Sequence, residues 1–196
     1  YLAVCVEKCS FAMALCVRKC WFSPKTCVEK CKHLTISCVE KCKAMKRKIY
    51  KQLVDWKNRE QHKPLILNGV RQCGKTYILK EFGRNEFDNL AYISCDRNES
   101  LHAIYAGDFD TARIIRGLSA LTGVDIIPGK TLIFLDEVQA FPQALEALKY
   151  FCEDAPEYHI VVAGSLLGVA LHAGISFPVG KIQSMRLFPM DFEEFL

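Results

Sequence analysis

The chain has 196 residues, of which 51% are hydrophobic and 24% are charged. This length and composition exclude a disordered protein and predict one hydrophobic core, and hence one globular domain with an appendage. No run of about 18 uncharged apolar residues occurs, and charged residues interrupt the start of the chain, so we expect neither a membrane-spanning helix nor a signal peptide. We therefore predict a cytoplasmic protein without a membrane partner.

The net charge of +4 is concentrated at the start of the chain. Residues 1–45 carry eight Lys or Arg and three Glu, whereas the remaining residues carry 18 basic and 19 acidic side chains. A protein that binds nucleic acid is expected to have a basic face on its folded part. The charge therefore does not indicate nucleic-acid binding by the main domain, and a nucleic-acid or protein partner stays an open question.

Eight of the 11 cysteines lie in a repeat that covers residues 1–44. Pentads of the form CVxKC begin every 11 residues, at Cys5, Cys16, Cys27 and Cys38. Cysteines four residues apart share one face of a helix and could present thiolate pairs to zinc. Against a zinc site, Pro24 interrupts a continuous helix and the usual C-x2-C spacing is missing. The sequence favours the alternative that the repeat is translated repetitive DNA, upstream of a start at Met45.

From residue 45 onward, helical patterns alternate with short apolar runs. The first predicted helix has an apolar face formed by Ile49, Leu53 and Trp56. We expect Gly83 to end the second helix and Gly123 the third, while Pro142 lies in the first turn of the fourth. The pattern predicts helices over residues 47–59, 76–83, 111–123 and 142–154, and strands over residues 63–70, 90–96, 131–137 and 159–165. Continuous apolar strands separated by helices predict an α/β fold, in which helices cover both faces of a parallel sheet.

The segment GVRQCGKT, from Gly69 to Thr76, follows a predicted strand and opens a predicted helix. The pattern G-x4-G-K-T in this context is typical of a phosphate-binding loop, although packing alone can also produce a glycine-rich turn. We expect Lys75 to reach the β and γ phosphates of a nucleotide and the Thr76 hydroxyl to bind magnesium. The predicted nucleotide-binding residues are Gly69, Val70, Arg71, Gln72, Cys73, Gly74, Lys75, Thr76 and Tyr77.

Two further strands end in polar residues that suit nucleotide hydrolysis. Asp136 follows four apolar residues and is predicted to bind magnesium, while Glu137 is predicted to polarise the attacking water. Adjacent acids at a strand end are also common solvated loop residues. Ser165 ends the fourth strand, where its hydroxyl could sense the γ phosphate if that strand lies between the other two. The predicted catalytic residues are therefore Lys75, Glu137 and Ser165.

The segments LILNGVRQCGKT, LIFLDEVQ, IVVAGS and GKIQSMRLFPMDFEEFL together resemble prokaryotic AAA-type ATPases that carry a C-terminal domain of unknown function with a nuclease-like fold. The resemblance covers about residues 45–196 and none of the cysteine repeat. It implies an AAA-like P-loop NTPase sandwich of three layers, with residues 1–44 as an appendage and residues 45–196 as a core truncated at its C-terminus. It also implies that Gly69–Thr76 is the Walker A loop, that Asp136 and Glu137 form Walker B, and that Ser165 is the first sensor position.

The chain departs from the family pattern at three positions near its end. Lys181 stands where the family commonly has arginine, and Met190 and Asp191 replace a leucine and a serine. If that arginine acts on a neighbouring subunit of a homo-oligomer, Lys181 supplies charge without the planar fork of a guanidinium. The resemblance therefore leaves efficient activation by a neighbour in doubt.

These observations favour an enzyme that binds Mg-ATP and hydrolyses it to drive or switch an attached C-terminal domain. Two alternatives stay open: a module that binds nucleotide without turnover, and a scaffold whose N-terminal cysteines bind zinc. A small-molecule kinase is disfavoured, because such an enzyme has no need of a glutamate that activates water. The absence of an N-K-x-D motif is consistent with ATP, and the choice of ATP over GTP rests on the resemblance.

Overall fold

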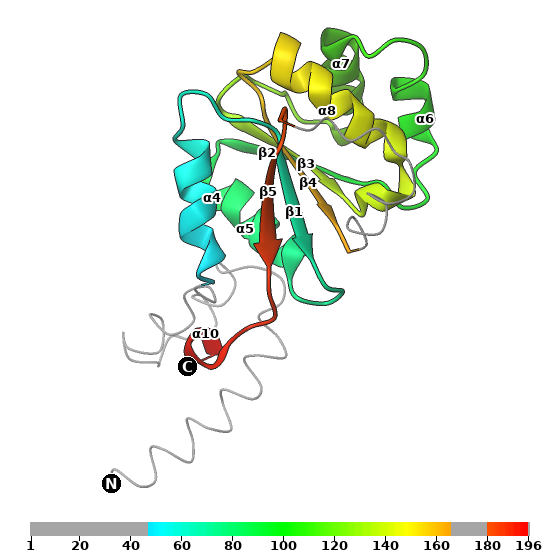
Figure 1. Ribbon diagram of the computed structural model, residues 1–196. Helices are drawn as coiled ribbons and strands as arrows, with labels where there is room; N and C mark the ends of the chain where they lie inside the picture. Colours follow the sequence, from blue (N-terminus) through cyan, green and yellow to red (C-terminus); the bar gives the residue numbers. More distant parts are fainter. Residues whose placement is uncertain (1–46, 166–179, 196) are drawn as a thin grey trace, which may run out of the picture. The chain divides into compact units, whose positions relative to one another are not determined.

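Alternating helices and parallel strands make up residues 47–165 and 180–195, the parts of the chain that the computed structural model describes (Figure 1). Both ranges belong to one unit that begins at Arg47. The cysteine repeat and the suggested start at Met45 lie outside the described residues, so the predictions about residues 1–44 and about the boundary at residue 45 stay predictions. Within the described ranges, no helix is both long and apolar enough to cross a membrane.

The helices and strands follow the order expected for an α/β protein. Three short elements, α6, the 3-10 helix η1 and α10, are additional to the predicted ones, as is the strand β5. The elements are α4 (Ile49–Lys57), β1 (Leu65–Gly69), α5 (Lys75–Glu86), β2 (Asn89–Ser94), α6 (Ser100–Ile104), α7 (Thr111–Thr122), β3 (Thr131–Asp136), η1 (Val138–Ala140), α8 (Pro142–Asp154), β4 (His159–Gly164), β5 (Gln183–Leu187) and α10 (Phe192–Phe195).

The strands form one five-stranded sheet in the order β2-β3-β4-β1-β5, and every neighbouring pair is parallel. In the register of β1, Leu65 lies opposite Val161 of β4 on one side and Gln183 of β5 on the other. Because all the strands run in one direction, their carboxyl ends share one edge of the sheet. Strand β4 lies between β1 and β3, which is the arrangement that the prediction for Ser165 required.

Two apolar clusters cover the two faces of the sheet, so the fold has three layers. Helices α4 and α5 pack on one face, and α6, α7 and α8 pack on the other (Figure 1). Alternate residues of β1 show the division, since Leu65 and Leu67 join the first cluster and Ile66 joins the second. Strands β3 and β4 are buried along their whole length, as the continuous apolar runs predicted.

The helix predicted to end at Gly83 continues to Glu86. A Cβ atom at Gly83 would lie 2.7 Å from Cδ1 of Leu90 and 3.2 Å from Cδ2 of Leu132, so the glycine lets these leucine side chains pack closely against the helix. Gly123, in contrast, caps α7 with a left-handed φ of 66°, as expected. A glycine in a helical pattern can therefore either end the helix or lie inside it where another element packs closely, and only the tertiary structure distinguishes the two cases.

Candidate functional site

The loop between β1 and α5 changes direction at two residues with positive φ. Gln72 has a φ of 61°, and Gly74 has a φ of 92° immediately before the first residue of α5. The first backbone N–H groups of an α-helix have no partner within the helix, and they carry the positive end of its dipole. The loop therefore leads into a helix start that suits an anion.

Gly69 is held against the neighbouring edge strand. A Cβ atom at this position would lie 2.6 Å from the backbone oxygen of Leu187 and 2.9 Å from Sγ of Cys73. A backbone atom cannot move aside as the end of a side chain can, so the close approach of β1 and β5 requires glycine here. The first glycine of the motif is thus needed by the packing between strands, in addition to any role in a ligand site.

Lys75 begins α5, and only 6% of the residue is exposed. Its ammonium group donates hydrogen bonds of 2.9 Å to the oxygen of Gly69 and 2.8 Å to the oxygen of Val70. The loop carbonyl groups therefore curl around the ammonium group and compensate for the burial of its charge. The positive charge of Lys75 is therefore held inside the loop, at the start of α5.

The hydroxyl of Thr76 donates a hydrogen bond of 2.7 Å to Oδ2 of Asp136. The two residues are 60 positions apart in sequence and belong to the two motifs that were predicted to share a metal ion. Asp136 is 4% exposed, its Oδ1 accepts a bond of 3.0 Å from the backbone N–H of Glu137, and the hydroxyl of Tyr92 lies 3.4 Å from Oδ2. The hydroxyl and carboxylate oxygens form a donor set that suits magnesium.

No group of three or more His, Cys, Asp and Glu side chains within residues 47–165 and 180–195 is arranged to hold a metal ion. Magnesium in nucleotide enzymes usually keeps several waters and binds the phosphates of the substrate, so one or two protein oxygens are enough. The Thr76–Asp136 pair fits that mode of binding and does not fit a zinc site. The structure thus offers oxygen donors for a metal that arrives with a nucleotide.

Glu137 has a backbone conformation that is uncommon for glutamate. Its φ of 52° and ψ of 43° are left-handed, and the 3-10 helix η1 follows directly. Its carboxylate accepts a short hydrogen bond from the side-chain amide of Gln139. The backbone of Glu137 is therefore in a strained conformation, and Gln139 restrains the Glu137 carboxylate. Gln139 was not predicted, and its only sequence signal is its position two residues after Glu137.

Ser165 directly follows β4, at the same edge of the sheet as Gly69 and Asp136. Its hydroxyl oxygen is buried and has no hydrogen-bond partner among the described residues. The strand order alone places this serine between the phosphate loop and the Asp136 turn. The structure thus brings the ends of the three predicted motif strands to one edge.

Other predicted residues lie at the rim of the loop or away from it. Val70 and Tyr77 have exposed fractions of 56% and 50%, and Arg71 and Gln72 are also exposed. Lys181 precedes β5 at the opposite edge of the sheet and forms an ion pair of 3.1 Å with Glu153. Lys181 therefore lies far from the loop of its own chain, and any action on a phosphate would have to occur in a neighbouring subunit.

The environment of Asp136 affects two neighbouring groups that the sequence did not single out. Burial, followed by the charge of Asp136, raises the pKa of the Tyr92 phenol. The same two causes, in the same order, raise the pKa of the Cys95 thiol to about 12. Both groups are therefore held in their neutral forms beside the carboxylate.

Comparison with known proteins gives one match to a protein family and several matches to solved structures. A model described as AAA domain matches residues 61–196. The Walker-type ATPase PABY2304 of Pyrococcus abyssi superposes with a TM-score of 0.51 at 15% identity, covering 77% of this chain and 55% of that one. No curated protein matches the chain.

Two further solved structures match with lower TM-scores. The Aeropyrum pernix Orc1 protein in complex with DNA superposes with a TM-score of 0.45 at 16% identity, covering 73% of this chain and 44% of that chain. The Pif1 helicase of Candida albicans has a TM-score of 0.38 at 11% identity, covering 76% and 40%. The chain thus spans about half the length of the solved structures that it matches.

Proposed function

Because the chain belongs to the AAA domain family and has the fold of a nucleotide-binding ATPase core, we propose that it binds Mg-ATP and hydrolyses it. The substrate's phosphates lie in the loop from Gly69 to Thr76, and the γ phosphate lies toward Asp136 and Glu137. The reaction is attack of water on the γ phosphate, with release of ADP and phosphate. The remaining loop residues, from Val70 to Cys73, together with Tyr77, border the nucleotide.

The observation that carries this proposal is the 2.7 Å hydrogen bond between Thr76 and Asp136. A glycine-rich turn formed for packing alone has no need of a hydroxyl directed at a buried carboxylate from another strand. The oxygens of Thr76 and Asp136 would hold the magnesium ion. When bound there, the ion would supply positive charge that compensates the phosphates.

The chain's own residues have separate tasks in this mechanism. Lys75 leaves the loop carbonyls to pair with the β and γ phosphates, which compensate its charge equally well. Glu137 orients the attacking water and accepts its proton, and Gln139 holds the carboxylate in position until the substrate is bound. The buried hydroxyl of Ser165 donates to the γ phosphate or the water, which gives that unpartnered group its hydrogen bond.

The wider role follows from the resemblance of residues 45–196 to prokaryotic AAA-type ATPases. We propose that hydrolysis drives or switches a nuclease-like domain that follows residue 196 in a longer protein. We also propose a homo-oligomer in which Lys181 approaches the phosphates bound by a neighbouring subunit. The ion pair of Lys181 with Glu153 at the surface would have to open for this contact, and about half of each side chain or less is exposed.

Calorimetric titration of Mg-ATP into the chain under reducing conditions tests binding. We expect saturable binding that is lost in Lys75→Ala, because the ammonium group that pairs with the β and γ phosphates is then missing. The matched control is Lys51→Ala, which removes an exposed lysine of α4. Equal binding by the unaltered chain and Lys75→Ala would contradict the proposed site.

Release of phosphate from ATP tests turnover separately. We expect Glu137→Gln to bind Mg-ATP normally and to lose about a hundredfold or more of its rate, because the base for the attacking water is removed. The control is Glu157→Gln, since Glu157 is exposed and lies just before β4, at the other edge of the sheet. Binding without turnover in the unaltered chain would favour the module that holds nucleotide without hydrolysing it.

A further inference from the structure

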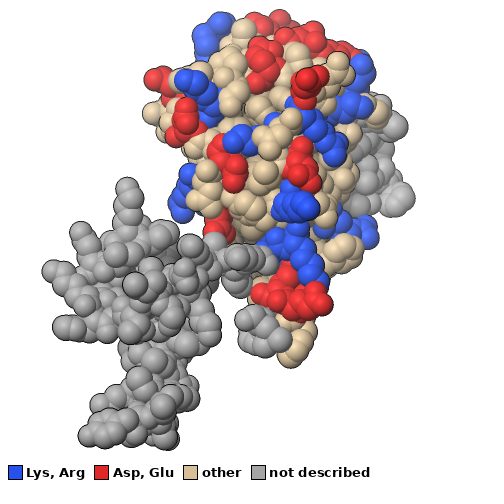
Figure 2. Space-filling model, turned by 90° about the vertical axis from the view of Figure 1, so that its left-hand side faces the viewer, with Lys and Arg blue, Asp and Glu red and all other residues tan. Residues whose placement is uncertain are grey.

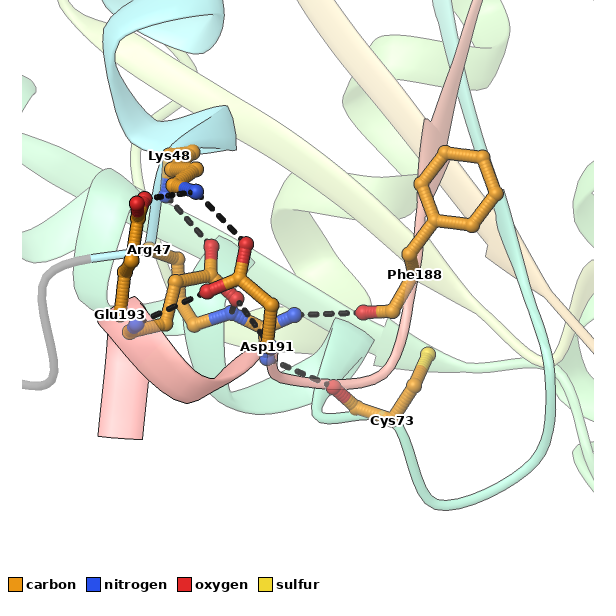
Figure 3. Close-up of polar contacts among 7 residues, drawn as sticks. Arg47, Lys48, Cys73, Phe188, Asp191 and Glu193 are labelled. Carbon is orange, nitrogen blue, oxygen red and sulfur yellow. Dashed lines mark hydrogen bonds and ion pairs between the residues drawn. The ribbon is translucent and has the colours of Figure 1, made fainter. Parts of the chain in front are cut away.

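Arg47 lies directly before α4, and its buried guanidinium contacts two other segments of the chain (Figure 3). It donates hydrogen bonds of 3.0 Å to the backbone oxygen of Cys73 in the phosphate loop and 2.5 Å to the backbone oxygen of Phe188 after β5. Its Nε lies 3.1 Å from Oε2 of Glu194, and the two side chains are only 6% and 8% exposed. One cation therefore joins the start of α4, the phosphate loop and the segment that follows β5.

Burial of a guanidinium is costly unless its charge and its N–H groups are compensated. Here backbone oxygens remote in sequence accept hydrogen bonds from Nη1 and Nη2, and the Glu194 carboxylate compensates the charge as an ion pair, although Nε itself donates no hydrogen bond among the described residues. Neither the loop nor the segment after β5 can move away without leaving part of this charge unpaired. The arrangement therefore makes the positions of the two segments depend on each other.

The contact with Cys73 determines which way the N–H group of Gly74 points. The carbonyl of Cys73 and the N–H of Gly74 belong to one planar trans peptide, so they point in opposite directions. Because Arg47 holds the carbonyl, the Gly74 N–H is directed away from the guanidinium. Without that contact the peptide could flip easily, since glycine adopts positive and negative φ with similar ease. A Cβ atom at Gly74 would lie 3.7 Å from Nη1 of Arg47, so the cation is close beneath this peptide.

The segment from Phe188 to Glu194 has its own fixed geometry. Asp191 accepts a hydrogen bond of 2.9 Å from the N–H of Glu194, and Oε2 of Glu194 lies 3.4 Å from the N–H of Asp191. This is a capping box, in which Asp191 serves as well as the serine of the family pattern. The box orients the Glu194 carboxylate toward Arg47. The change from serine to aspartate at this position therefore preserves the turn.

Lys48 also contacts the segment from Phe188 to Glu194, from the position next to Arg47. Its ammonium lies 2.6 Å from Asp191 and 2.5 Å from Glu193, and its backbone N–H donates a bond of 2.7 Å to Oε1 of Glu194 (Figure 3). These ion pairs are exposed and contribute little stability on their own. Their effect is to hold the capping box against the start of α4. Acidic and basic side chains are mixed over the face that Figure 2 shows.

We propose that Arg47 is a positioning residue that couples nucleotide at the phosphate loop to the segment Phe188–Glu194. This inference rests on the proposed function, since it assigns a means of regulation to the same site. Coupling is reciprocal: a nucleotide that needs the Gly74 N–H stabilises the contact of Arg47 with Phe188 and Glu194, and displacement of that segment weakens nucleotide binding.

The test combines nucleotide affinity with hydrogen exchange in Arg47→Met, which removes the guanidinium but keeps an apolar stem. We expect the Kd for Mg-ATP to rise about tenfold or more, because the Gly74 peptide is no longer held. Within residues 189–194, where Pro189 has no amide hydrogen, we expect Mg-ATP to slow hydrogen exchange in the unaltered chain, and we expect this effect to be lost in Arg47→Met. Arg59→Met, at an exposed arginine after α4, is the matched control, with a Kd within about twofold of the unaltered chain.

Circular dichroism identifies the temperatures at which each variant is folded, and binding is compared there. A merely structural Arg47 would lower stability without changing the Kd or the response of residues 189–194, and that result would overturn the coupling. If Arg47→Met does not fold, Glu194→Gln decides by the same two measurements, since it removes only the charge that orients Arg47. Failure of the unaltered chain to bind Mg-ATP would overturn the proposed function and this inference together, whereas normal binding by a folded variant overturns the coupling alone.

Discussion

Lowering the pH is expected to destabilise the protein through a pair of histidines beneath α4. His159, the first residue of β4, is 7% exposed and stacks on His62 with ring centroids 3.8 Å apart. Trp56 and Phe87 enclose the His159 ring edge-on, and its Nδ1 is buried without a partner among the described residues. Burial, and then the charge of His62, lowers the pKa of His159 from 6.5 to about 4. Burial also lowers the pKa of His62.

The lowered pKa of His159 determines how stability changes with pH. Because the pKa is lowered by folding, both states are neutral at high pH, and the unfolded state binds the proton first as the pH falls below 6.5. With pKa values of 6.5 and about 4, His159 alone costs about 2 kcal/mol of unfolding free energy between about pH 7.5 and about pH 5. For a domain of this size, that loss corresponds to a fall in Tm of roughly 4–8 °C.

Urea unfolding at the two pH values, with a reductant for the cysteines, measures this loss. In His159→Phe the contribution of His159 is absent, so the pH-dependent loss should shrink by about 2 kcal/mol. His102→Gln is the control, since His102 is exposed and its replacement should leave the loss as it is in the unaltered chain. A loss below about 0.5 kcal/mol in the unaltered chain, or an equal loss in His159→Phe, would refute the reasoning.

Three substitutions in or beside the site give further predictions. Gly69→Ala should lower the unfolding free energy by about 1–3 kcal/mol in urea titrations, because the new methyl group meets the backbone of Leu187 at 2.6 Å. Gly83→Ala should cost less than that, since the group it meets is the end of the Leu90 side chain and alanine contributes about 1 kcal/mol of helix propensity. Thr76→Val should weaken the binding of Mg-ATP, measured by calorimetry, and leave the binding of metal-free ATP nearly unchanged, because valine keeps the shape of the side chain and lacks its oxygen. Equal weakening of both would contradict a metal role for Thr76.

The elements with strong local patterns were predicted well from the sequence. Strands β3 and β4 are continuous apolar runs, and such runs are buried wherever the sheet is covered on both sides. The apolar face of α4 was predicted from the spacing of Ile49, Leu53 and Trp56, and all three are buried. These predictions succeeded because hydrophobic periodicity is a property of a few consecutive residues.

Hydrophobic periodicity could not predict strand β5 or the role of Arg47. Strand β5 lies at the edge of the sheet, and its residues alternate between exposed or half-buried and buried positions, with Arg186 exposed. Five residues with that pattern carry a weak signal. Arg47 precedes a helix in a basic stretch, where a solvated side chain is the ordinary expectation. Its burial depends on oxygens supplied by Cys73, Phe188 and Glu194, which no local pattern connects to it.

The sequence by itself determined the class of fold, the phosphate-loop pattern and the acidic residues at the end of β3, because each depends on neighbouring residues and on their chemistry. The tertiary structure decided which of them meet: the order of the strands sets β4 between β1 and β3, brings the Thr76 hydroxyl to Asp136 and closes β5 against Gly69. Contacts of this kind join residues tens of positions apart, and they form only when the whole sheet is assembled and its packing compensates the cost of bringing the segments together.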